Sequence, residues 1–242
     1  MNNMKGKGMK TSNKILVAVS IVPFIIILMM LFSFRNILDK EPAMINQDSA
    51  KTNYHTEKND LGSFDGIRAE GIWDIVLNRG DHCRIELETP DNSTTHASVT
   101  RQGNTLVLTS NKESFSFFNR PKISITLPSI SRLDLFGKYD VKISNLKISK
   151  LDINLKGVAS FVGTDSSVED FSLNGNGVLN TDFKLMPVTN AHYNFTGFYL
   201  MEMNMNGGEL SGRLSGSGKL VISGHVSANK LQTNGPGNIV FK

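Results

Sequence analysis

Two aspartates have the spacing in this sequence that best suits catalysis. Asp74 and Asp140 each stand three positions after a glycine of a repeated pattern, so they share one outward column if the chain coils. Paired carboxylates cleave glycosidic bonds when they lie about 5–10 Å apart in a groove. No third polar partner or base stands in the same register, so the pattern favours a solvated face. We predict no catalytic residue.

The other residue types that carry chemistry are scattered along the chain. The five histidines include no pair with metal-ligand spacing. The glycines stand inside alternating segments rather than before a helix, which argues against a phosphate-binding loop. The single cysteine, Cys83, alternates with Ile85 and Leu87, as a buried thiol does. The sequence therefore predicts no metal site, no cofactor and no internal disulfide.

Two sets of apolar residues are candidates for a partner surface. They are Phe115, Phe117, Phe118, Val162, Val221 and Val240. The three phenylalanines lie in the stretch ESFSFFNRP and would form either an exposed aromatic tip or a flap tucked against the fold. The valines belong to an outward column of the repeat. A packing face for another subunit and the β-propensity of valine both explain that column.

Short strands with a glycine at a fixed place must position these residues. When the chain is aligned on seven glycines, the residues two and four positions before the glycine are apolar in six of seven cases. The residue four positions after the glycine is apolar in all seven cases, and the residue three positions before it in none. The glycines are Gly71, Gly137, Gly157, Gly175, Gly197, Gly216 and Gly235. Alternation with period two indicates strands with one buried face. Repetition at about 20 residues indicates coils that stack on one another.

The predicted fold is all-β, a parallel β-helix or solenoid with coils of about 20 residues over positions 63–242. We expect Leu135, Leu155, Leu173 and Leu214 in one interior file, and glycines that point inward where the coil is narrow. Residues 80–128 look like longer strands that extend the first coils. We expect this insert, or a second copy in a homo-oligomer through the β-helix end, to cover the end near residue 242.

The N-terminal part has a different composition. Residues 1–14 contain four lysines and no acid, and residues 15–34, ILVAVSIVPFIIILMMLFSF, are uncharged and mostly apolar. This run is long enough to cross a bilayer as one helix. A cleaved signal peptide is the alternative, but no small-residue cleavage pattern follows. The positive-inside rule then predicts a cytoplasmic basic tail at 1–14, a transmembrane anchor at 15–34 and a polar linker at 35–62, with the remainder extracytoplasmic.

Four stretches resemble, in this order, a bacterial family described as putative auto-transporter adhesin, head GIN domain. They are FDGIRAEGIWDIVLNRGDHCRIELETPDN, GNTLVLTS, KISITLPSISRLDLFG and LSGRLSGSGKLVISG. The similarity covers about Phe64 to Phe241. It implies a right-handed parallel β-helix at the bacterial cell envelope, and neither a known reaction nor catalytic residues. Tyr139 and Tyr199 depart from the pattern, because they are bulky where the family usually has small residues.

These features predict a non-enzymatic bacterial envelope protein, anchored by one pass in the inner or cell membrane. Its β-helix would serve adhesion, scaffolding, or the binding of a glycan or an envelope protein. The first alternative is a carbohydrate-active enzyme, a polysaccharide lyase or hydrolase, on the same fold. The second is an ectodomain that signals through a partner. No nucleic-acid partner is expected, because residues 36–242 carry 21 basic and 22 acidic side chains.

Overall fold

The computed structural model describes residues 54–90, 96–110 and 120–242. These residues belong to one compact unit, Thr52–Lys242. The predicted tail, membrane helix and most of the linker lie outside the described residues, as do Phe115, Phe117 and Phe118. Within the described ranges, none of the structure is a helix of the length and apolarity that a membrane span requires.

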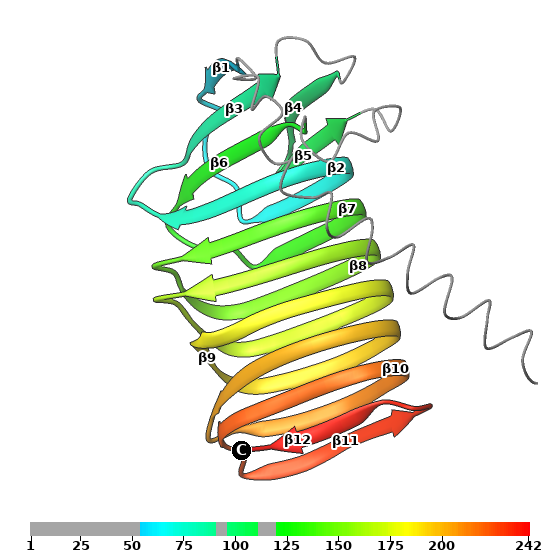
Figure 1. Ribbon diagram of the computed structural model, residues 1–242. Coiled ribbons are helices and arrows are strands. Elements are labelled where there is room, and N and C mark those ends of the chain that lie inside the picture. Colours follow the sequence, from blue (N-terminus) through cyan, green and yellow to red (C-terminus); the bar gives the residue numbers. More distant parts are fainter. Residues whose placement is uncertain (1–53, 91–95, 111–119) are drawn as a thin grey trace, which may run out of the picture. The chain divides into compact units, whose positions relative to one another are not determined.

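The regular structure of the described residues consists of twelve β-strands (Figure 1). Their bounds are β1 Tyr54–Asn59, β2 Gly66–Arg79, β3 Arg84–Pro90, β4 Ala97–Gln102, β5 Thr105–Ser110, β6 Lys122–Leu127, β7 Arg132–Ser144, β8 Lys147–Thr164, β9 Ser167–Asn206, β10 Glu209–His225, β11 Ala228–Asn234 and β12 Asn238–Phe241. β2 and the strands from β7 to β12 wind into a parallel β-solenoid of about six turns. The prediction of an all-β solenoid is confirmed.

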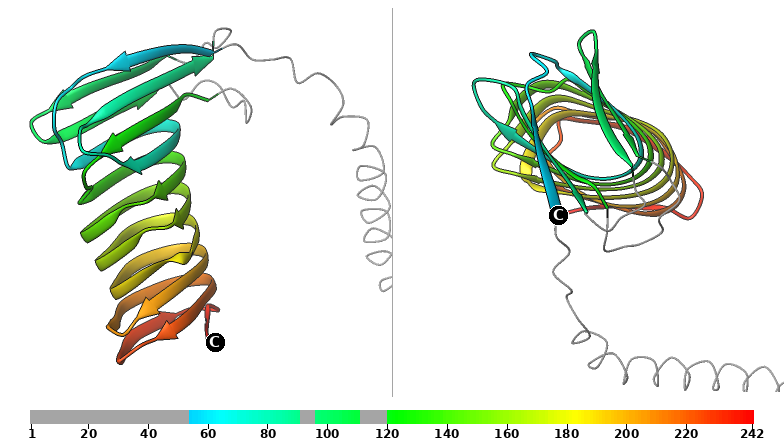
Figure 2. Two further views of the ribbon diagram at one scale, coloured as in Figure 1. Left: turned by 90° about the vertical axis from the view of Figure 1, so that its left-hand side faces the viewer. Right: turned by 90° about the horizontal axis from the view of Figure 1, so that it is seen from above.

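Each coil pairs in parallel with the coil before it (Figure 2). Leu133 of β7 stands opposite Ile153 of β8, and Leu214 of β10 stands opposite Phe195 of β9. The offset is thus 20 residues in the first case and 19 in the second. Because side chains alternate between the two faces of a strand, this register places apolar side chains of successive coils in files inside the solenoid. Those files are buried and form one continuous core.

The strands of the insert lie at the β2 end of the stack. β5 pairs with the first half of β2 and β6 with its second half. β4 adds to β5, while β3 and then β1 add to β6, all antiparallel. The insert therefore does not cover the opposite end, where β11 and β12 pair with β10. Our expectation of such a cover is wrong, and the second-copy alternative stays a prediction.

The glycine alignment needs one correction. Gly177, not Gly175, stacks on Gly157, and Gly175 stands opposite Leu155. Leu173 accordingly stands opposite Ile153, outside the file that contains Leu135 and Leu155. Two glycines that are two residues apart have the same parity, so a slip of two leaves every side chain on its expected face. Alternation alone could not distinguish them.

The stacked glycines are required by the coil beneath them rather than by a narrow interior. Gly137, Gly157, Gly177 and Gly197 have φ between +133° and +152°, where other residues are strained. A Cβ built on Gly177 would overlap the carbonyl oxygen of Gly157, and each neighbouring pair repeats this relation. Our expectation that these glycines point inward is therefore wrong. Their missing side chain would face the preceding backbone.

The two bulky tyrosines, Tyr139 and Tyr199, are accommodated inside the solenoid in different ways. The Tyr139 hydroxyl donates to the Ala69 carbonyl at 2.6 Å and accepts from the Phe136 N–H at 2.9 Å, so its polar end is paired. Burial raises the pKa of Tyr139. Tyr199 is fully buried and extends toward Gly218 and Gly237, where an added Cβ would collide with its ring or hydroxyl. Glycines in later coils thus provide its space.

Replacing a stacked glycine should test this packing. We expect Gly177→Ala to lower the free energy of unfolding by about 3 kcal/mol or more, because it adds a backbone collision to the strained φ. Gly103→Ala is the matched control, since Gly103 has φ +61° and open space around a built Cβ. The control should cost about 1–2 kcal/mol. If urea unfolding gave the two variants equal losses of stability, the positive φ alone, and not the contact with the preceding coil, would be the reason for glycine.

Candidate functional site

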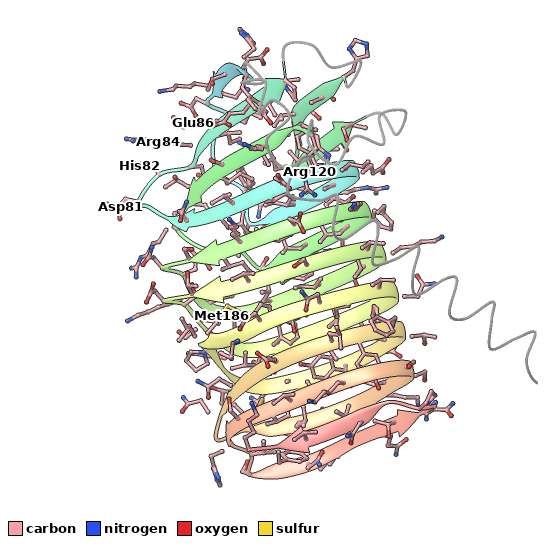
Figure 3. All side chains as sticks on the ribbon, in the orientation of Figure 1. Asp81, His82, Arg84, Glu86, Arg120 and Met186 are labelled. Carbon is pink, nitrogen blue, oxygen red and sulfur yellow. The ribbon has the colours of Figure 1, made fainter. Side chains whose placement is uncertain are left out.

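Asp74 and Asp140 stack on adjacent coils, as their spacing predicts. Asp74 of β2 stands opposite Asp140 of β7 in the parallel register. Arg120 lies where the chain enters β6 beside β2 (Figure 3). Its Nε is 2.8 Å from Asp74 Oδ1, and its Nη2 forms an ion pair with Asp140 Oδ2. One guanidinium therefore bridges carboxylates on two coils.

This third partner could not be found from the sequence. Arg120 lies within the insert at 80–128, whose length breaks the 20-residue period, so no column of the repeat includes it. Only the pairing of β6 with β2, which places Lys122 opposite Asp74, brings it to the two carboxylates. The Asp74 N–H also donates to the Pro121 carbonyl at 3.0 Å. The backbone thus fixes the place where the guanidinium enters.

The cluster lies in a groove of about 400 Å³. Burial raises the pKa of Asp74 above its ordinary value, and the neighbouring Asp140 adds to this, while Arg120, Lys122 and Lys142 oppose it. Arg120 itself is only 20% exposed. The remaining lining residues of the groove are Ile75, Val76, Glu88, Ser124, Val141, Ser160 and Val162.

The arrangement differs from that of a glycosidase. Retaining and inverting enzymes leave the space between their two carboxyl groups to the sugar or to water, and one of the two must be protonated. Here the Arg120 guanidinium forms ion pairs with both carboxylates and bridges them. The geometry is that of an ionic bridge between coils. Within the described residues, no group of three or more His, Cys, Asp or Glu side chains could hold a metal ion.

The predicted valine column is interrupted by charges. Corrected for the register, it reads Val76, Lys142, Val162, Asp182, Glu202, Val221 and Val240. Lys184 pairs with both Asp182, at 3.0 Å, and Glu202, at 2.7 Å. Val162 is 37% exposed, whereas Val221 is only 7% exposed. A partner role for these valines stays a prediction, as it does for the three phenylalanines outside the described residues.

A more exposed apolar row lies directly after the stacked glycines. Val158, Val178 and Phe198 follow Gly157, Gly177 and Gly197, and their exposed fractions are 42%, 43% and 46%. Leu200, on the same coil as Phe198, is 48% exposed. We call these four residues the apolar stripe. Our sequence reasoning missed it, because alignment on Gly175 assigned Val178 to the column of Asp74 and Asp140.

Before the stacked glycines, the outer side of the coils is polar. Three positions before the stacked glycines, four successive coils carry Asp134, Asn154, Asn174 and Asn194. The Asn154 side-chain amide donates a hydrogen bond to Asp134 Oδ1 at 2.7 Å. The residues five before include Ser172, His192 and Ser211. We call these two columns the polar face. It contains shallow grooves of about 350 and 370 Å³.

With this geometry established, comparison with known proteins identifies the family. The model of the family described as putative auto-transporter adhesin, head GIN domain, matches residues 63–241. The chain belongs to this family. No curated protein matches the chain.

Solved structures share the fold. A putative adhesin from Bacteroides fragilis is 21% identical, with a TM-score of 0.57 over 78% of this chain and 97% of that one. A putative adhesin from Parabacteroides merdae is 15% identical over 78% and 96%, with a TM-score of 0.46. A putative lipid binding protein from Parabacteroides distasonis is 16% identical over 78% and 97%, with a TM-score of 0.44. At these identities, the first likeness establishes the architecture and the other two add nothing to it.

Removing the bridging guanidinium should make stability depend more strongly on pH. The folded chain holds the Asp74 proton more tightly than the unfolded chain, so the free energy of unfolding falls as pH rises from 3.8 through the raised pKa. Arg120→Gln removes the nearest opposing charge and raises this pKa further. We expect a loss of about 2 kcal/mol at pH 7 and a smaller loss at pH 4, where Asp74 gains its proton.

Urea unfolding of the variant at both pH values measures this difference. Adding Asp74→Asn to Arg120→Gln removes the unpaired carboxylate, so it should restore part of the stability at pH 7. An equal loss at pH 4 and pH 7, with no recovery in the double variant, would attribute the effect to lost packing of the arginine side chain instead.

Proposed function

We propose that this protein is a non-enzymatic, membrane-anchored protein of the bacterial cell envelope. Its right-handed β-solenoid would act in adhesion or scaffolding by binding a glycan or an envelope protein. The anchor would be the apolar run at 15–34, with residues 1–14 in the cytoplasm and the solenoid extracytoplasmic. Membership of the adhesin-like family supports the class of function.

The repetitive outer surface is the observation that carries this proposal. Some outward columns repeat one kind of side chain at the strand spacing of about 4.8 Å. Asn154, Asn174 and Asn194 form such a column, and each is held by a strand paired to its neighbours. A surface of this kind is preorganised, so little conformational entropy is lost when a ligand binds. It suits a ligand that is itself extended and repetitive.

A carbohydrate-active enzyme is the second candidate. The stacked Asp74 and Asp140, in a groove of about 400 Å³, are the observation in its favour. The bridging Arg120 is the observation against it, because it forms ion pairs with both carboxylates that would have to share acid and base roles. The two proposals differ in whether a bound glycan is cleaved.

A glycan panel separates binding from cleavage. We expect the full-length protein, in a detergent without a sugar head group, to retain at least one envelope or host polysaccharide and to release no fragments. Retention is measured by affinity electrophoresis and cleavage by the appearance of new chain ends. Asp74→Asn and Asp140→Asn should leave retention unchanged. Fragment release that either variant abolishes would establish the enzyme, and a panel with no retained glycan would leave only the protein-binding form of the proposal.

Membrane topology can be tested with single cysteines. In a Cys83→Ala background, Lys147→Cys on the exposed start of β8 should react with a membrane-impermeant maleimide in intact spheroplasts. Asn3→Cys in the basic tail should react only after lysis. Labelling of Asn3→Cys in intact spheroplasts, or release of the chain into the soluble fraction, would contradict the proposed anchor.

A further inference from the structure

The end of the solenoid formed by β11 and β12 has an uncovered strand edge. Both strands pair with β10, and within the part of the chain that the structure describes no strand pairs with their other side. This end lies opposite β1, the first described strand (Figure 1). An edge of this kind presents backbone N–H and C=O groups with which another strand can pair.

The last layer of the core is open at the same end. Ile239 is only partly buried, whereas Leu220, which stands opposite it in β10, is fully buried. Phe241 is 52% exposed, whereas Ile222 opposite it is buried. These interior side chains lack the next coil that covers their equivalents along the stack. A partner that supplies such a coil would remove their apolar surface from water.

The backbone of the edge is directed outward at the apolar positions. The Lys242 N–H donates to the Ile222 carbonyl at 2.9 Å. Because residues of a parallel ladder alternate in the side to which they bond, Ile239 directs its backbone groups away from β10. The Leu231 N–H donates to Asn229 Oδ1 at 3.1 Å, a local bond that a partner strand can replace.

Charge does not protect this edge from pairing. β11 and β12 contain a single charged residue, Lys230, which forms an ion pair at 2.6 Å with Glu209 of the preceding coil. An outer strand at the opposite end, β1, carries His55, Glu57 and Lys58. Charges on an edge strand discourage pairing with another chain. The end formed by β11 and β12 is therefore the one that suits an added coil.

The shape of the edge selects its occupant. The edge follows Ile222, which Phe241 covers, and so takes in about residues 224–242, a full coil. A single extended peptide would cover β11 or β12 and leave the other strand open. A partner with the same cross-section covers both, and a second copy of this chain has that cross-section. The edge is only slightly shorter than the roughly 20–30 residues that each side of a standard interface contributes.

We propose that two copies of this protein join end to end through β11 and β12 about a two-fold axis. A coil rises by one strand spacing per turn, so two ends meet along their whole edge only where the axis crosses near the middle of that edge. This middle lies close to the turn between β11 and β12. β11 of one copy therefore pairs antiparallel with β12 of the other.

The register of this pairing follows from the interior positions. Leu231 stands opposite Ile239 of the second copy, because opposed residues lie on the same face of a sheet and both belong to the interior. A slip of one residue would place each against an outward side chain. The outward pairs are then Lys230 with Val240 and Gln232 with Asn238. No like charges oppose one another, and the contact does not depend on the ligand of the proposed function.

Paired charge variants test the contact in the full-length protein, by sedimentation equilibrium in a density-matched detergent. The parent should form dimers. Gln232→Lys/Asn238→Lys opposes like charges across the contact, so it should weaken self-association about tenfold or more, as should Gln232→Glu/Asn238→Glu. An equimolar mixture of the two variants should associate as the parent does. Asn176→Lys/Asn180→Lys, exposed on the Gly177 coil, is the matched control and should leave the dimer unchanged.

A disulfide between copies tests the register. In a Cys83→Ala background, Lys230→Cys/Val240→Cys should give a linked dimer on mild oxidation. Opposed residues that exchange no hydrogen bond in an antiparallel ladder have Cα atoms about 4.5 Å apart, which a disulfide can span. Each single variant should stay unlinked, because position 230 faces position 240 and not its own equivalent.

Unfolding curves of the charge variants should match the parent, since Gln232 and Asn238 are exposed. A parent that stays monomeric would overturn the inference. Self-association that the charge variants leave unchanged, or that their mixture does not recover, would also overturn it, because the contact would then lie elsewhere on the chain. Linked dimers in a single-cysteine variant, or none in the double variant, would overturn the register. Each of these failures leaves the proposed function standing.

Discussion

The close approach of one coil to the next at the stacked glycines is the contact on which the solenoid depends. From Gly137 to Gly197, each of these glycines has a positive φ and presents its backbone to the carbonyl of the glycine one coil earlier. No side chain can occupy that contact. Because the contact fixes the offset between coils, it also fixes which apolar side chains meet in the interior and which polar ones share an outward column.

The outer surfaces follow from the same constraint. The polar face precedes the stacked glycines and the apolar stripe follows them, so the row of glycines separates two kinds of chemistry. Neither surface needs a loop to hold it in place, since both lie on strands paired along their length. This rigidity suits the proposed binding of a repetitive ligand, because such a ligand can engage several coils without ordering them first.

The Asp74, Arg120 and Asp140 bridge has a different origin. It joins the insert to the first two coils, and it lies where β6 continues the stack above β2. Two like charges on adjacent coils repel one another unless a cation lies between them. The guanidinium supplies that cation, so the cluster that most resembled an active site also serves to attach the insert to the regular coils.

Alternation and the repeat determined the all-β solenoid, the coil length and the inward parity, since these depend only on local periodicity. Both Gly175 and Gly177 satisfied that periodicity, so the sequence left the register of one coil open. The tertiary structure decided it: Gly177 stands against the Gly157 carbonyl, while Gly175 stands against the carbonyl of Leu155. The correct register also revealed the apolar stripe. The pairing of β6 with β2 placed Arg120, whose position no periodic pattern could encode.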